Sequence, residues 1–344
     1  MTATIREATE KAKLVRTAES LDRGAAGAEL DGLIEAETEL GRTIAAFLLR
    51  KAGRDDRYQD RADPVYLRTY AVQRTLFGER AYRQKIDLLK DMLARRRGRV
   101  TLLVLGIEGD VLTRALQALH AEGGDCSRIT VAIVDPLAEE VEREAKRLRA
   151  LRAAPGAVLA FARSAEGLTE AEWEQIRGTS GEFVVYALLS LHFICEPGQR
   201  DDLFRRLHAL GRVTVALLEH DLDLLRTRSL AERVDLVWHY YLPQFALVAG
   251  LACTAEERSV LLDRLGLMVR DCLSDARDVL CLRYTESHAG WSARLLAAGF
   301  SHDPNPRRGD LGRLPGAGIT VASWDDRSRR FYLCSTNYDA RNQE

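Results

Sequence analysis

Carboxylates and histidines stand at the ends of short apolar runs in this sequence. Asp135 directly follows the run ITVAIV. Glu219 and His220 directly follow VTVALL, and His192 comes four residues after FVVYAL. A carboxylate accepts hydrogen bonds from paired hydroxyl groups, and a carboxylate or imidazole can orient or deprotonate a hydroxyl, an amine or another imidazole. Because a carboxylate buried beside an apolar run needs a partner or a function, these positions are candidates for ligand binding and proton transfer.

The elements that would position these residues have the pattern of a parallel α/β sheet. After Gly98, runs rich in Val, Leu and Ile alternate with helical stretches, which is typical of strands buried on both faces. Five β-α repeats imply right-handed crossovers and a doubly wound sheet, on which ligands bind beyond the carboxyl ends of the strands. The predicted strands are 100–105, 129–134, 157–162, 183–188 and 213–219, and the predicted helices are 111–121, 136–151, 169–177 and 200–210.

Two further regions are predicted to be helical. Residues 1–97 form a helical N-terminal cap, with an apolar stripe from Leu30 to Leu48, and residues 98–344 form the α/β domain. A helical insertion at about 225–277 interrupts that domain, and Pro243 is expected to kink its first helix. A helix at 287–298 ends at Gly299. The closing segments GITVASWD and RRFYLCSTNYD, joined by DDRS, predict a terminal antiparallel hairpin.

The composition is that of an ordinary soluble protein. The chain has 344 residues, 46% of them hydrophobic, and a formal net charge of -1. Basic and acidic residues are interspersed, so no one-sided basic field points to nucleic acid. The run Arg95, Arg96, Arg97 and Arg99 is most simply a solvated helix C-terminus, with phosphate binding as the alternative.

Sequence signals for membranes and metals are also missing. No apolar run reaches the roughly 18 residues of a membrane span, and the charged first residues do not resemble a secretory signal, so a cytoplasmic location is expected. The six cysteines are scattered, with no C-x-x-C pair and no His at ligand spacing, so we expect neither disulfides nor a metal site.

Several blocks of the C-terminal half resemble the GRAS domain. They are ALLSLHFICEPGQRDDLFRRLHAL, VTVALLEHDLD, LAERVDLVWHYYLPQFALV and YTESHAGWSARLLAAGF. The last parallels the family's Glu, Trp, Arg and Ala-Gly-Phe pattern through Glu286, Trp291, Arg294, Ala298, Gly299 and Phe300. The resemblance covers roughly residues 184–300 and is looser over 100–135. GRAS is a plant transcriptional-regulator domain with bacterial relatives that look like class I S-adenosylmethionine-dependent methyltransferases.

The resemblance implies a Rossmann-like methyltransferase fold that binds S-adenosyl-L-methionine. Gly106 and Gly109 would let the backbone approach the cofactor's carboxypropyl tail, and Glu108 would bind its methionyl ammonium. Asp135 would accept the paired ribose hydroxyls. An ordinary strand-to-helix turn and an ordinary helix start remain the alternatives for these positions. Ser164 and Tyr186 are two further candidate cofactor positions. Ser164, together with Arg163, would flank adenine at the end of the third strand, and a surface loop is the alternative for these two residues.

The function implied is methyl transfer to a small molecule or peptide side chain, in bacterial specialised metabolism. His192, Glu219 and His220 are the catalytic candidates, although His192 also fits a partly buried structural position. Substrate contacts are assigned to Tyr240, Gln244 and Trp291, and a core position is the alternative for Trp291.

Two other functions are alternatives to methyl transfer. One is a catalytically silent GRAS-like ligand-binding or protein-interaction module. The other, a nicotinamide-dependent oxidoreductase, is disfavoured because G-x-G-x-x-G is missing. The expected partner is a small-molecule or peptide substrate, without nucleic acid or membrane, and a homodimer is left open.

Overall fold

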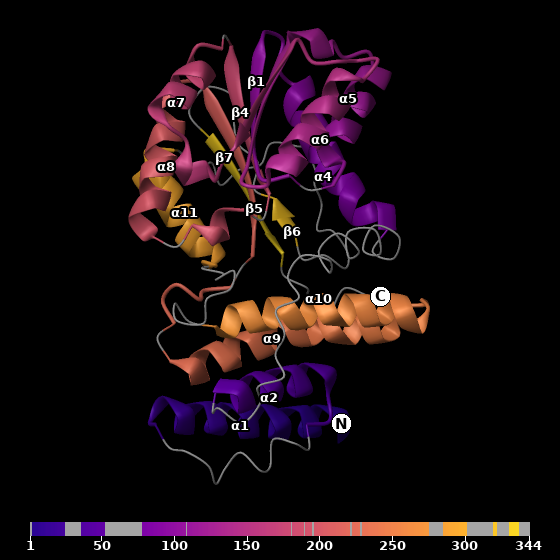
Figure 1. Cartoon of the computed structure of the whole chain (residues 1–344), viewed down its shortest axis with the longest axis vertical. Coiled ribbons are helices and arrows are strands. Elements are labelled where there is room, and N and C mark those ends of the chain that lie inside the picture. The colour runs from indigo at the N-terminus through magenta and orange to yellow at the C-terminus, as the bar shows by residue number, and fades with distance from the viewer. Residues whose placement is uncertain are drawn as a thin grey trace. The chain divides into compact units, whose positions relative to one another are not determined.

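The computed structural model places the chain in two compact units (Figure 1). The first comprises Met1–Gly78, Leu222–Glu286 and Tyr338–Glu344, and the second comprises Glu79–Asp221 and Ser287–Asn337. We call them the helical unit and the α/β unit. The structure describes residues 2–24, 36–51, 78–107, 109–179, 181–188, 190–194, 196–220, 222–227, 229–274, 285–300, 319–321 and 330–336.

A mixed, mainly parallel sheet forms the centre of the α/β unit. In the described part of the chain it has seven strands in the order β3-β2-β1-β4-β5-β7-β6, with β6 alone antiparallel to its neighbour. Apolar side chains dominate the central strands, and every residue of β1 and β5 is buried. The strands are β1 Val100–Leu105, β2 Ile129–Asp135, β3 Ala157–Ala162, β4 Glu182–Leu188, β5 Val213–Glu219, β6 Ile319–Val321 and β7 Arg330–Thr336.

Helices cover both faces of this sheet (Figure 1). On one face, α4 (Gly78–Ala94), α5 (Val111–Ala121) and α6 (Ala138–Arg149) share a core with alternate residues of β1, such as Leu102 and Val104. On the other, α7 (Glu170–Arg177), α8 (Pro197–Ala209) and α11 (His288–Ala297) pack with Leu103 and Leu105. This doubly wound arrangement confirms the fold class predicted from the alternation of apolar runs and helices.

The division into units lies elsewhere than at residue 97. Helix α4 falls in the α/β unit, where Leu89 and Leu93 are fully buried together with Val100 and Leu102. These two leucines are four residues apart, so they lie on the same side of the helix and face the sheet. Periodicity identified a helix here but carried no information about which core the helix joins.

The helical unit contains four described helices with one shared core. They are α1 (Thr2–Asp22), α2 (Glu39–Lys51), α9 (Leu230–Gly250) and α10 (Ala255–Leu273). Of the predicted N-terminal stripe, Leu40, Ile44, Phe47 and Leu48 are buried, whereas Leu30, Leu33 and Ile34 lie outside the described residues. Helix α9 continues through Pro243.

Long-range caps join the helices of this unit. The Asp22 carboxylate, at the end of α1, accepts from the backbone N–H groups of Leu230 and Ala231 at 3.1 and 3.2 Å. Glu10 accepts from the N–H groups of Glu37 and Thr38 just before α2. Because the first N–H groups of a helix have no partner within it, these contacts tie α1 to the start of α9 and of α2.

The end of the chain supplies the last two strands of the sheet. Strands β6 and β7 pair antiparallel, and β7 lies beside β5 and parallel to it. The predicted connection at 322–329 lies outside the described residues, so the hairpin itself stays a prediction. In the described segments, no helix is both long and apolar enough to cross a membrane.

Candidate ligand-binding edge of the sheet

The turn after β1 is joined to the end of β2. Gly106 has a φ of 86°, a left-handed conformation that glycine adopts without strain, and its N–H donates to Val134 O at 2.9 Å. The next backbone N–H, that of Ile107, donates to Asp135 Oδ2 at 3.0 Å. The turn continues to Gly109, at φ 56°. The two strand ends that the sequence assigned to one cofactor are therefore adjacent.

Asp135 is partly buried and accepts two backbone hydrogen bonds. Besides Ile107, the N–H of Leu137 donates to Oδ1 at 2.9 Å. Burial raises the pKa of Asp135, and the N–H groups of Ile107 and Leu137 oppose that rise. A carboxylate has about four lone-pair sites, so roughly two remain for a ligand. Asp135 thus serves as a brace for the glycine turn and keeps capacity to accept hydroxyl groups.

The strand order reverses between β1 and β4. A side-chain hydrogen bond joins the carboxyl ends of these two strands. Ser190, just after β4, donates from Oγ to Leu105 O, the last residue of β1, at 2.8 Å. Ligands of doubly wound sheets bind at such reversals of strand order. Ser190 was not singled out from the sequence, because a serine in a loop carries no distinctive signal.

The catalytic candidates His192 and Glu219 form a buried pair. His192 Nδ1 lies 2.7 Å from Glu219 Oε2, and each side chain is only 1% exposed. Glu219 Oε1 accepts from the backbone N–H of Leu191 at 2.7 Å. Burial raises the pKa of Glu219, while His220, the Leu191 N–H, Arg200 and the Ser190 N–H oppose that rise.

His220 and Arg200 complete the surroundings of this pair. The His220 ring meets the His192 ring edge-on with centroids 5.2 Å apart, and His220 is 5% exposed. Arg200 is 1% exposed and donates from Nε to Ile194 O at 2.9 Å. The structure therefore brings the three catalytic candidates together, but inside the protein. Through the contacts of Glu219 with Leu191 and His192, they hold the loop between β4 and α8 against β5.

The remaining candidates within the α/β unit occupy different settings. Ser164 is partly exposed in the loop after β3. Tyr186 is buried in the core, and its hydroxyl donates to Lys85 O of α4 at 3.1 Å, so it does not face the edge. Trp291 is also buried, with Phe204 edge-on at 6.2 Å and the Arg200 guanidinium 4.8 Å from its ring centre. Its core position agrees with the alternative raised from the sequence.

Tyr240 and Gln244 lie in the core of the helical unit. Each is 8% exposed, and Gln244 Nε2 donates to Tyr240 O within α9. The Tyr240 ring stands edge-on to that of Tyr241 at 5.0 Å. Their burial gives no support to a substrate-contact role. Glu108, assigned to the methionyl ammonium, lies outside the described residues.

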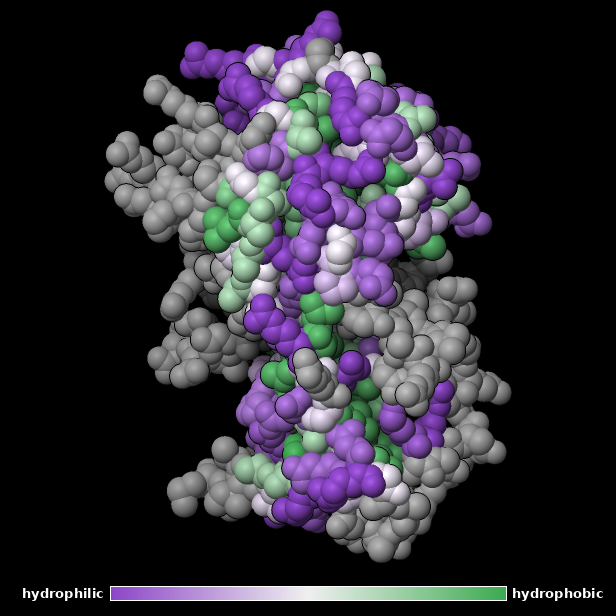
Figure 2. Space-filling model, turned by 90° about the vertical axis from the view of Figure 1, so that its left-hand side faces the viewer, coloured by the Kyte–Doolittle hydropathy of each residue, from purple (hydrophilic) through white to green (hydrophobic). Residues whose placement is uncertain are grey.

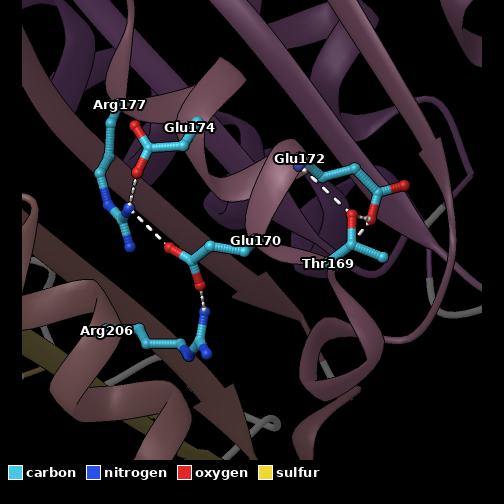
Figure 3. A network of polar contacts seen from close by, with 6 residues as sticks. All are labelled: Thr169, Glu170, Glu172, Glu174, Arg177 and Arg206. Atoms are coloured by element: carbon cyan, nitrogen blue, oxygen red, sulfur yellow. Dashed lines mark hydrogen bonds and ion pairs between the residues drawn. The ribbon is translucent and has the colours of Figure 1, made fainter.

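Charged residues after β3 belong to a surface network (Figure 3). Thr169 and Glu172 form a capping box at the start of α7, and Arg163 pairs with Glu172 at 2.8 Å. Glu170 accepts from Arg177 and from Arg206 of α8, each at 2.8 Å. Arg163 is therefore engaged in holding the start of α7.

Two exposed apolar residues on this edge were missed by sequence reasoning. Leu137, two residues after Asp135, is 62% exposed, and Phe193, next to His192, is 39% exposed. With Leu296 they are the exposed large hydrophobic side chains among the described residues. In a sequence they look like ordinary core residues, so only their exposure distinguishes them. Within the described residues, no cluster of three or more His, Cys, Asp or Glu side chains could hold a metal ion.

Comparison with known proteins supports the fold. No family model and no curated protein matches the sequence. Among solved structures, SCL7 from Oryza sativa, a GRAS-domain protein, matches with a TM-score of 0.64 and 16% identity, over 90% of this chain and 93% of that one. GRAS proteins are plant transcriptional regulators. The likeness establishes a shared fold, in line with the resemblance read from the sequence blocks.

Proposed function

We propose that this chain is an S-adenosylmethionine-dependent methyltransferase that binds its cofactor across the ends of β1 and β2. The observation that supports this most is the hydrogen bond from Ile107 N–H to Asp135, which joins the glycine turn to the carboxylate at the next strand end. The acceptor is a small molecule or peptide side chain, and the proposed setting is the cytoplasm of a bacterium.

The residues of this edge suit the cofactor. Asp135 keeps lone pairs for the ribose hydroxyls, and Gly106 and Gly109, which adopt left-handed conformations, carry no side chain that would keep a ligand from their backbone. The exposed Leu137 offers an apolar surface beside Asp135 for the adenine. When bound, S-adenosylmethionine supplies an electrophilic methyl group.

The chain's own contribution is positioning. Glu219 holds Leu191 and His192, and Ser190 holds the end of β1, so the loop after β4 is fixed beside the site. Holding the reactants in the correct orientation removes much of the free-energy barrier to an in-line displacement. Because Glu219 and His192 are each 1% exposed, we assign them to positioning, and proton removal is needed only for acceptors that carry a proton.

Calorimetric titration with S-adenosylmethionine and with NAD(H) tests the proposal. Asp135→Ala should weaken S-adenosylmethionine binding at least tenfold, a loss of about 1.4 kcal/mol. Asp125→Ala is a matched control, since Asp125 caps the N–H of Ser127 before the opposite end of β2 in the same i to i+2 pattern. Equal affinities for the two variants, or binding of NAD(H) alone, would exclude the assignment.

A catalytically silent ligand-binding module is the second candidate. The burial of His192, Glu219 and His220 favours it, because groups so enclosed cannot easily exchange protons with an acceptor. Incubation with S-adenosylmethionine and hydroxyl, amine and imidazole acceptors separates the two candidates. Formation of S-adenosylhomocysteine supports methyl transfer, and cofactor binding without any turnover supports the silent module.

A further inference from the structure

Arginines gather at the amino edge of the sheet, opposite the proposed cofactor site. The connections that lead from each helix into β1 to β5 contain seven arginines and no lysine. Three carboxylates accompany them, Glu122, Asp125 and Glu182, so seven against three leaves an excess of four positive charges. The whole chain has a net charge of -1. We name this surface the arginine edge: Arg95, Arg96, Arg97, Arg99, Arg128, Arg152 and Arg212.

Backbone contacts hold the connections side by side. Gly156 N–H donates to Ile129 O, Glu182 N–H to Arg99 O and Phe183 N–H to Arg212 O, at 2.8 to 3.0 Å. The packing is close, because a Cβ on Gly156 would stand 2.2 Å from Ser127 O and one on Gly181 2.0 Å from Arg99 O. Strands lie about 4.8 Å apart, so five neighbouring strands spread these arginines over about 19 Å.

Carboxylates and backbone oxygens of the same unit neutralise the charges of the arginine edge only in part. Arg96 and Arg212 share one carboxylate, that of Glu182, and Arg128 donates to the backbone oxygens of Gly98 and Leu93. Arg95, Arg97 and Arg152 are exposed and form no ion pair with any carboxylate in the part of the chain that the structure describes.

Helix dipoles explain only some of these positions. The dipole favours cations at the C-terminal end of a helix, which accounts for Arg95 and Arg96, the first two residues after α4, but not for Arg97, which stands three residues beyond it. Arg99 stands five residues beyond the end of α4, and Arg152 and Arg212 each stand three beyond the helices before them. Arginine also binds phosphate through two parallel N–H groups, which lysine cannot do.

We propose that the arginine edge docks the phosphate backbone of a nucleic acid, a function separate from the proposed methyl transfer. Of the exposed large hydrophobic residues that the structure describes, Leu137 and Phe193 follow the opposite, carboxyl ends of β2 and β4, and Leu296 lies on α11. A protein interface has an apolar or aromatic core, whereas phosphates are bound by charge and by the N–H groups of arginine. Figure 2 shows mostly hydrophilic residues over the end of the α/β unit that is uppermost in that view.

Fluorescence anisotropy with labelled random-sequence DNA and RNA oligonucleotides tests the proposal. The full-length protein should bind, with an affinity that falls steeply between about 50 and 200 mM salt. The triple variant Arg95→Glu, Arg97→Glu, Arg152→Glu should lose at least tenfold in affinity, and the salt slope should fall by about one for each phosphate contact removed.

A second triple variant controls for overall charge. Arg143→Glu, Arg163→Glu and Arg205→Glu change the net charge equally at partly or well exposed arginines elsewhere on the unit. Unaltered binding by this variant supports the arginine edge as the site. Equal losses in both variants, no binding by the unsubstituted protein, or stronger binding of polyglutamate than of the oligonucleotides would overturn the proposal. Circular dichroism checks that both variants fold, and S-adenosylmethionine titration reports separately on the carboxyl edge.

Discussion

At the scale of single residues, the sequence identified which groups would meet but not how they would be used. Glu219 and His192 are 27 positions apart and touch at 2.7 Å, as the strand-end rule predicts. Solvent exposure decides whether such a pair acts as a general base or only holds the structure together. That exposure depends on which neighbouring elements cover the pair. Here the exposure of 1% for each side chain favours a brace.

Removal of the Glu219 carboxylate should therefore act mainly on stability. Glu219→Ala leaves the N–H of Leu191 and the His192 ring without their buried acceptor, and we expect a loss of about 3 kcal/mol in unfolding free energy. Urea denaturation measures it. Glu196→Ala, an exposed position in the same loop, should change stability little. A fully stable Glu219→Ala protein that has lost only methyl transfer would restore the catalytic interpretation.

Glu144 provides a pH-dependent test. This carboxyl is 1% exposed, burial raises its pKa, and the Thr113 hydroxyl and Arg147 oppose that rise. The folded state therefore holds the Glu144 proton more tightly than the unfolded state, so the stabilising contribution is complete below about pH 4.3 and declines as pH rises through the raised pKa. Compared with Glu144→Gln, the unsubstituted protein should lose stability over that range.

Thermal unfolding from about pH 4 to about pH 8 checks this expectation. Glu142→Gln, two residues earlier on the exposed side of α6, is the matched control. A stability difference between the unsubstituted protein and Glu144→Gln that does not change with pH would refute the expected linkage.

At the scale of elements, local capping and long-range capping differ in how well a sequence reveals them. The Ser229/Glu232 and Thr254/Glu257 boxes form as reciprocal caps at the starts of α9 and α10, and both have the local S/T-x-x-E spacing that a sequence shows. Asp22 caps the same turn of α9 from 208 residues away, a contact that no local pattern predicts.

Asp22 should stabilise the helical unit through this contact. Asp22→Ala removes an acceptor for two backbone N–H groups of α9 and should lower the unfolding free energy by about 1–2 kcal/mol. Chemical denaturation followed by circular dichroism measures the loss. Glu19→Ala, an exposed position one turn earlier on α1, should be nearly neutral, and equal losses would mean that the cap contributes nothing specific.

At the scale of the whole molecule, the fold separates charges that are mixed along the chain. Along the sequence the charges are interspersed, which predicts no one-sided basic field and no nucleic-acid partner. Parallel α/β topology brings the helix-to-strand connections of β1 to β5 to the amino edge, where seven arginines meet, and the opposite ends of these strands to the carboxyl edge, where Asp135 lies. The proposed nucleic-acid surface reverses the earlier expectation for this reason.

The sequence by itself determined the α/β class, the bounds of β1, β3 and β5, and the placing of Asp135 beside the glycine turn and of His192 and Glu219 at neighbouring strand ends. Apolar runs are local features of a sequence, and the side of the sheet on which each strand ends follows from parallel topology. Both can therefore be inferred before the structure is known. Only the tertiary structure decided that α4 joins the sheet, that Tyr186, Tyr240 and Gln244 are buried, and that Leu137 and Phe193 are exposed. Burial depends on which distant element covers a residue, and that is a property of the packed chain alone.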